Sequence, residues 1–202
     1  MKMKGLLLAC CVALLPVFRA VGQTPGVDQK LAGVIDSLYA ADQGTVQIKP
    51  ADSAAAAYQR VIRTNFPAVK RILDMYGYPT HARVGQQSTQ HYFLLVQHSD
   101  FDLAFQQRAL KMMRREVRRH QASGQQYAYL VDRIAINQGQ PQVYGTQVLM
   151  SGNTKLKPCL APAQLNKRRQ AVGLEPIEAY LEKCNAVFYE MNPQQRPQPG
   201  AR

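Results

Sequence analysis

The chain has 202 residues, of which 46% are apolar, and a formal net charge of +12. This length fits one domain with its own hydrophobic core. Apart from the N-terminal segment, no stretch is long and apolar enough to cross a bilayer, so we expect the mature protein to be soluble. The excess of Lys and Arg makes anionic partners the first class to consider.

The first 22 residues have the composition of a secretory signal peptide, so we predict export to the periplasm or the medium. A basic start, the apolar run Leu6 to Val17 and the small residues Ala20-Val21-Gly22 supply its three parts. Pro16 interrupts the run before the roughly 20 apolar residues of a membrane anchor. Leu7-Leu8-Ala9-Cys10 resembles a lipoprotein box, but almost no apolar region precedes the cysteine, so we do not expect lipidation. Cleavage removes three basic residues and lowers the net charge from +12 to +9.

Three helices are predicted before the breaker Gly77-Tyr78-Pro79. The first ends at Gly44, and the second runs through the alanines to about Arg63. Asn65-Phe66-Pro67 predicts the start of the third, because proline is well tolerated in the first helical turn. The apolar stripes are Leu31, Val34, Ile35 and Leu38 in the first helix and Val69, Ile72, Leu73 and Tyr76 in the third.

Helices are also predicted through the middle of the chain. Tyr92 to Val96 is an apolar run that fits a buried helix or a buried strand, and we predict a helix. Asp100 is expected to cap a long helix from Phe101 to about Gln121. A shorter helix follows over Tyr127 to Ile134. The polar side of the long helix carries Arg108, Lys111, Arg114, Arg115, Arg118 and Arg119.

A change of pattern after Gly139 and Pro141 predicts one small β-hairpin. Gln142 to Met150 has the β-favouring composition of a strand, and Lys155 to Cys159 is its predicted antiparallel partner. Between them, Ser151-Gly152-Asn153-Thr154 is a cluster of turn residues.

Two helices, at about Pro162 to Ala171 and Glu175 to Met191, complete the predicted domain. The tail from Asn192 to Arg202 is rich in Pro and Gln and is predicted to be disordered. The predicted fold class is mainly α (α+β). It comprises a signal peptide over residues 1–22, one mostly helical domain with a single antiparallel β-hairpin over 23–191, and a disordered tail over 192–202.

Cysteines and histidines limit the metal and redox chemistry. Cys159 and Cys184 remain after the signal peptide, and an oxidising compartment allows a disulfide between them, although two separately buried thiols fit equally well. His91 and His98 are seven residues apart, which on a helix places them on one face but about 10 Å apart, too far to share one ion. We expect no metal site and no other cofactor.

His98-Ser99-Asp100 is a candidate for acid–base chemistry. A histidine held beside a carboxylate can exchange protons near neutral pH. The alternative, which the sequence by itself favours, is that Asp100 or Ser99 only caps the following helix.

Two further groups combine charged and amide side chains. Asp132 and Arg133 are adjacent on a predicted helix and therefore point in different directions. Arg168 and Arg169 belong to a basic run. Such a run is usually a solvated face, but its guanidinium groups can also bind a carboxylate or phosphate.

Four polar side chains near the predicted hairpin allow two interpretations. Either they lie exposed around a turn glycine, or they line a cleft against the helix that carries Asp132 and Arg133. They are Gln142, Tyr144, Thr146 and Gln147.

The basic side of the long helix is most simply a solvated face. Its sharper interpretation is contact with an anionic membrane or envelope surface. Nucleic acid is not expected as a partner, because aromatic residues do not alternate with these arginines and no nucleic-acid-binding motif occurs. No oligomeric state is predicted.

Several of these segments resemble a bacterial family called domain of unknown function 6624, over roughly Asp52 to Tyr180. The segments are Gly77-Tyr78-Pro79, His98-Ser99-Asp100, Gln106, Asp132-Arg133, Gln142-x-Tyr144-Gly145-Thr146-Gln147 and Arg168-Arg169 with Gly173-Leu174. The chain departs from the family in lacking tryptophan, and Tyr78 and Tyr92 or Phe93 stand in its place. The resemblance brings no assigned activity, but it implies that these polar positions form one site.

The leading hypothesis is a polar cleft that binds a small anionic or sugar-like ligand and hydrolyses it or transfers one of its groups. In this hypothesis His98 is the acid/base and Asp100 or Asp132 orients it, while Arg133 and Arg168 hold negative charge. The other expected ligand contacts are Gln106, Gln142, Tyr144, Thr146, Gln147 and Arg169. The competing hypothesis is a non-catalytic envelope interaction module that uses the basic helix.

Overall fold

The computed structural model describes residues 26–45 and 51–196. These residues form seven α-helices and one two-stranded antiparallel sheet, which confirms the predicted fold class. The helices are α1 (Gln29–Gly44), α2 (Ala51–Tyr76), α3 (His81–Gln97), α4 (Leu103–Arg118), α5 (Gly124–Asn137), α6 (Leu165–Ala171) and α7 (Ile177–Met191). The strands β1 (Val148–Leu149) and β2 (Lys155–Leu156) pair Val148 with Leu156 and Leu149 with Lys155.

The ends of the chain are described only in part. The predicted signal peptide, residues 1–22, and residues 197–202 of the predicted disordered tail lie outside the described residues. Within the tail, Pro193–Gln195 forms a short 3-10 turn after α7, and a second such turn, Pro162–Gln164, precedes α6. None of the described helices is both long enough and apolar enough to span a bilayer.

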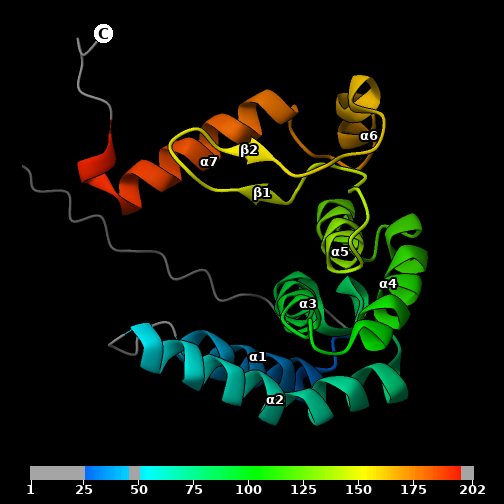
Figure 1. Ribbon diagram of the computed structural model, residues 1–202. Coiled ribbons are helices and arrows are strands. Elements are labelled where there is room, and N and C mark those ends of the chain that lie inside the picture. The colour runs from blue at the N-terminus through cyan, green and yellow to red at the C-terminus, as the bar shows by residue number, and fades with distance from the viewer. Residues whose placement is uncertain (1–25, 46–50, 197–202) are drawn as a thin grey trace, which may run out of the picture.

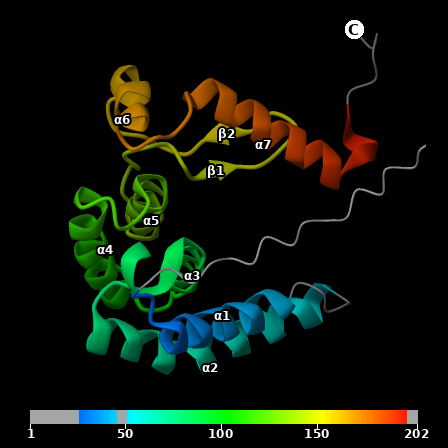
Figure 2. The same ribbon diagram turned by 180° about the vertical axis from the view of Figure 1, so that it is seen from behind.

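Helices α3, α4 and α5 lie between two arms of the molecule (Figure 1). One arm is the pair α1 and α2, and the other is the hairpin with α6 and α7, an arrangement that Figure 2 shows from behind. The hydrophobic core fills the space among α1 to α5. Its most buried side chains include Ile35, Leu73, Tyr92, Val96, Met113 and Leu130.

Helix α2 is continuous through Pro67, so the predicted break at this residue is wrong. A proline in a helix interior loses one backbone hydrogen bond and costs about 3 kcal/mol. Ile62, Phe66, Val69 and Leu73 recur at helical spacing on both sides of it, and they are buried or partly buried against the rest of the protein. The packing of this uninterrupted apolar face offsets the local cost.

The middle of the chain is helical as predicted, but one cap differs. The apolar run Tyr92 to Val96 lies in α3, which confirms the prediction of a helix over a strand. Helix α4 begins at Leu103 and is capped by Asp102, whose Oδ1 accepts from the backbone N–H of Phe105 at 2.9 Å. The prediction that Asp100 caps this helix is therefore wrong, and its carboxylate is used elsewhere.

The hairpin is present but shorter than predicted, with two residues in each strand. Gln142 makes an isolated parallel bridge with Cys159 instead of starting a long strand. The segment between Gln142 and β1 stays out of the ladder because its backbone N–H groups bond to the side chain of Asp132. Cys159 and Cys184 are both free thiols, so the structure contains no disulfide between them.

Candidate functional site

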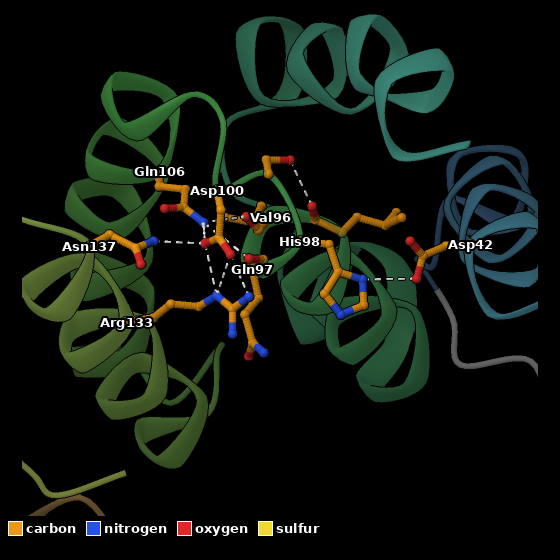
Figure 3. A network of polar contacts seen from close by, with 10 residues as sticks. Asp42, Val96, Gln97, His98, Asp100, Gln106, Arg133 and Asn137 are labelled. Atoms are coloured by element: carbon orange, nitrogen blue, oxygen red, sulfur yellow. Dashed lines mark hydrogen bonds and ion pairs between the residues drawn. The ribbon is translucent and has the colours of Figure 1, made fainter. Parts of the chain in front are cut away.

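The imidazole of His98 is held by a carboxylate from α1, 56 positions earlier in the sequence. His98 caps the C-terminus of α3, and its Nδ1 lies 2.9 Å from Oδ2 of Asp42 in the last turn of α1 (Figure 3). The Asp42 side chain is completely buried, whereas 18% of the His98 side chain is exposed. Because an ionised carboxylate only accepts hydrogen bonds, this contact places the ring proton on Nδ1 and leaves Nε2 as the basic atom.

Asp42 was missed by the sequence analysis, which named Asp100 or Asp132 as the residue that orients His98. The pair spans 56 positions of sequence, so no local motif contains it. One signal was present: a carboxylate in the last turn of a helix opposes the helix dipole. Within the described residues, Oδ1 of Asp42 is buried and has no hydrogen-bond partner. Unmet buried acceptors of this kind accompany functional sites or bound solvent.

Asp100 holds a guanidinium group instead of capping α4 (Figure 3). Its carboxylate accepts from Arg133 through Nε at 2.8 Å and through Nη2, from Asn137 at 2.9 Å and from Gln106 at 3.1 Å. Burial by itself raises the pKa of Asp100, but the hydrogen bonds and charge of Arg133, with those of Gln106 and Asn137, outweigh it and hold the pKa below its usual value. The two-point contact leaves Nη1 of Arg133 on the side away from Asp100.

Gln106 of α4 helps to hold the Asp100 carboxylate in place. Its side chain is fully buried, and its Nε2 also donates to the backbone carbonyls of Val96 and Gln97, each at 3.1 Å. The amide thus ties α4 to the end of α3, immediately before His98. Gln106 was expected to contact a ligand, and the structure gives its amide nitrogen to the protein.

Tyr58 of α2 packs against His98 and lies close to the charged groups of both ion pairs. Its ring packs edge-on against the His98 ring, with 5.5 Å between the centroids. Burial and the negative charge of Asp42 raise the pKa of Tyr58 to about 12, while Arg133 acts in the opposite direction. The phenol is therefore neutral at physiological pH and lies within electrostatic range of both pairs. We call Asp42, Tyr58, His98, Asp100 and Arg133 the His98 site.

Asp132 belongs to a different network on the other side of α5. Its side chain is fully buried and accepts from the backbone N–H groups of Val143 at 2.7 Å and of Tyr144 and Thr146, each at 2.9 Å. The Thr146 hydroxyl donates to the same carboxylate at 2.9 Å. The expected role of Asp132 beside His98 is therefore not what the structure shows, because its acceptors are used to fix the segment before β1.

The other predicted residues of this region also bond mainly to backbone. Arg169 is 1% exposed and donates to the carbonyls of Tyr144 at 2.7 Å, Gly145 and Glu175. Arg168 donates to the carbonyl of Val143 at 2.7 Å and to those of Leu160 and Ala161. The buried amide of Gln142 bridges the backbone of Gln147 and Lys157. We call Asp132, Gln142, Thr146, Arg168 and Arg169 the loop network.

Tyr144 and Gln147 keep partly exposed side chains beside the loop network. Burial, Tyr127 and Asp132 raise the pKa of the Tyr144 phenol. Gln147 donates to the Thr146 hydroxyl at 3.2 Å. The predicted site residues are thus divided between two groups, because Asp132 and Arg133 project from different sides of α5.

A second Asp–His pair lies outside both groups. Nδ1 of His91 is 2.8 Å from Oδ1 of Asp36, and Tyr39 stacks on the imidazole at 3.8 Å between centroids. Both histidines face α1 from one side of α3, as their spacing predicts for a helix, and each has its own carboxylate. Within the described residues, no cluster of three or more His, Cys, Asp or Glu side chains is arranged to hold a metal ion.

The fold and the two polar groups define a mostly helical protein with a small hairpin, a site built from an Asp–His and an Asp–Arg pair, and a separate buried loop network. The chain belongs to a family of unknown function (DUF6624), whose model matches residues 25–190. The match includes every residue of the His98 site and of the loop network, and it confirms the resemblance found in the sequence. Comparison with curated proteins and with solved structures finds no match.

Proposed function

We propose that the His98 site binds a small anionic ligand and hydrolyses it or transfers one of its groups, with His98 as the acid/base. The observation that carries the proposal is that the tripeptide His98-Ser99-Asp100 makes two ion pairs. His98 pairs with Asp42, and Asp100 pairs with Arg133. Because His98 and Asp100 are two residues apart, these two contacts hold an imidazole and a guanidinium group at the same turn of the chain.

The free groups of the site favour an acceptor-rich ligand. Both oxygens of Asp100 are occupied by protein donors, and the charge of Asp42 is buried behind the imidazole. The outer N–H groups of Arg133 remain as donors, and 28% of the Arg133 side chain is exposed. Within the described residues the Tyr58 hydroxyl makes no hydrogen bond to the protein, so it is a further potential donor. Phosphate and carboxylate groups match a guanidinium in this geometry.

The acid–base step follows from the tautomer of His98. Nε2 accepts the proton of a water or ligand hydroxyl while that oxygen attacks the phosphoryl or acyl centre. The imidazolium, stabilised by Asp42, then returns the proton to the departing oxygen. The neutral Tyr58 phenol and the Arg133 guanidinium stabilise negative charge that develops on the ligand.

Inorganic phosphate is a suitable first probe, with the imidazole signals of His98 and His91 followed by NMR at pH 7. We expect phosphate to shift the His98 signal and leave His91 unchanged, because the Asp100–Arg133 pair lies two residues along the chain from His98. The described contacts of His91 are an ion pair with Asp36 and stacking on Tyr39. R133A should weaken phosphate binding roughly tenfold or more, as loss of a charged hydrogen bond predicts. Equal shifts at both histidines, or unchanged binding by R133A, would contradict the proposal.

Activity provides a separate test, with the anionic ester p-nitrophenyl phosphate as the substrate. General acid–base catalysis contributes about 10² to 10⁴-fold to rate, so H98Q should lose most of any turnover and D42N a smaller part. H91Q is the matched control and should keep the wild-type rate. Turnover that persists in H98Q would remove this residue from the mechanism.

The basic face of α4 supports a second candidate, contact with an anionic membrane or envelope surface. Arg108 is paired with Asp74 at 2.6 Å, but Lys111, Arg114, Arg115 and Arg118 are exposed and form no ion pair within the described residues. Sedimentation with phosphatidylserine vesicles, at low and high salt, tests this candidate with the variant R114E/R115E/R118E. Binding that salt does not weaken, or that the variant retains, would exclude the α4 surface.

A further inference from the structure

A cavity separate from the His98 site lies between α3 and α5. Its volume is about 490 Å³, within the range of small-molecule sites. The α3 wall carries Gln86, Gln90 and Gln97, and the α5 wall carries Gln125, Gln126 and Tyr129. We call this cavity the glutamine groove.

The lining of the glutamine groove carries no fixed charge. No Lys, Arg, Asp or Glu contributes to it, although the chain as a whole has a net charge of +12. Its one basic side chain is His81, and burial lowers the pKa of His81, so the imidazole is neutral at physiological pH. A groove of this kind selects against anions and cations, because nothing in it compensates their loss of hydration.

The carboxamides of the groove are available to a ligand. Gln125 donates to the carbonyl of Gly173, and the other four have no hydrogen-bond partner within residues 26–45 and 51–196. Each carboxamide presents donors and an acceptor together, which matches hydroxyl and amide groups. Gln86, Gln90 and Gln97 follow one stripe of α3 that is about 16 Å long, so the ligand is elongated.

We propose that the glutamine groove binds an uncharged oligosaccharide segment that carries hydroxyl and acetamido groups. Ring hydroxyls on both edges of a sugar chain can reach both walls, while the apolar faces of the rings pack on the partly exposed ring of Tyr129. Peptides are recognised through sheet edges, apolar helix grooves or aromatic polyproline grooves, and two helices lined with carboxamides offer none of these.

The glutamine groove is independent of the proposed anionic site. It ends at Gln97 and Tyr129, one residue before His98 and one helical turn before Arg133. The two sites therefore have separate residues and separate probes, and either can fail without the other.

Titration with chitotetraose, a neutral tetramer of N-acetylglucosamine, tests the groove through the side-chain NH₂ signals of an isotope-labelled protein. We expect the signals of Gln90 and Gln126 to shift and those of Gln87 to stay, because Gln87 is exposed on α3 outside the groove. Q90A/Q126A should weaken chitotetraose binding roughly tenfold or more. Q87A is the matched control and should bind as the wild type does.

Three outcomes would overturn the proposal. They are no shift of the groove glutamines by chitotetraose, equal affinity in Q90A/Q126A, and shifts produced by end-blocked tetraalanine but not by chitotetraose. The variants also separate this proposal from the function proposed above. Q90A/Q126A should still bind phosphate at His98, and H98Q should still bind chitotetraose.

Discussion

Asp132 and Arg133 show how the phase of a helix assigns neighbouring residues to different tasks. Successive residues on an α-helix are turned by about 100°. Asp132 is consequently buried against the segment before β1, and Arg133 reaches Asp100 at the surface. The sequence identified both as polar residues with a specific partner. It did not supply the partners, because these lie on segments whose position depends on the tertiary fold.

The same limit explains which members of the His98 site could be predicted. His98, Asp100 and Arg133 stand out because charged residues flank a helix boundary or occur as an adjacent pair. Tyr58 and Asp42 each lie in an ordinary helical pattern, and only the packing of α1 and α2 against α3 brings them to the imidazole. Sequence therefore singled out His98, Asp100 and Arg133, but it did not single out the side chains from α1 and α2 that pack against His98.

Acid should weaken the domain partly through Asp100. The folded protein holds the pKa of this carboxyl below its ordinary value near 3.9. Between these two values the unfolded chain binds more protons than the folded one, so the stabilisation is complete above the ordinary pKa and disappears as pH falls through the folded pKa. In urea unfolding between pH 2 and pH 5, D100N should show a smaller loss of stability on acidification than the wild type.

D102N is the control for this measurement, because Asp102 is also a surface carboxylate near the same turn but caps α4 instead of pairing with a guanidinium. A pH dependence of D100N as steep as that of the wild type would show that the Arg133 contact has no effect on protonation.

At the scale of elements, helix content was predictable and helix boundaries were less so. The stripe of apolar residues in α2 predicts its core-facing side, yet Pro67 was taken as a boundary because its local effect is unfavourable to helix. The strands were overestimated because β-favouring residues between Gln142 and β1 bond to a buried aspartate instead of to each other. In both cases a long-range contact decided against a local preference.

Replacing Pro67 with Ala should stabilise the protein. Pro67 is exposed, so little packing is lost, and alanine restores a backbone N–H toward the carbonyl of Arg63. Alanine also leaves the unfolded chain with more conformational entropy than proline does, which reduces the gain in stability. We expect about 1–2 kcal/mol of added stability in urea unfolding. A destabilised P67A would show that the proline sets a necessary bend.

The control for P67A is A68G, at the next position of α2. This substitution should lower the stability by up to about 1 kcal/mol, the difference in helix propensity between alanine and glycine.

At the scale of the whole molecule, the two arms are stabilised by different interactions. Helices α1 to α5 share the hydrophobic core, with Ile35, Tyr92 and Leu130 completely buried. The hairpin, α6 and α7 contribute few core residues, and Ile177 is the one buried side chain of α7. Their attachment to α5 runs through the loop network, in which Asp132 and Arg169 bond to the same segment from opposite sides.

Hydrogen exchange should therefore reveal two levels of stability, because regions with few buried apolar contacts open at lower free energy than a packed core. We expect residues 141–191 of R169M to exchange faster than in the wild type, while α1 to α5 keep their protection. The loss of Arg169 leaves the carbonyls of Tyr144, Gly145 and Glu175 without their donor, which should lower the opening free energy by about 3 kcal/mol.

R118M is the control for this measurement, because Arg118 is exposed on α4, and it should leave the exchange pattern unchanged. An equal loss of protection across all helices in R169M would mean that the chain unfolds as one cooperative unit, and that the loop network stabilises the core as much as the arm it holds.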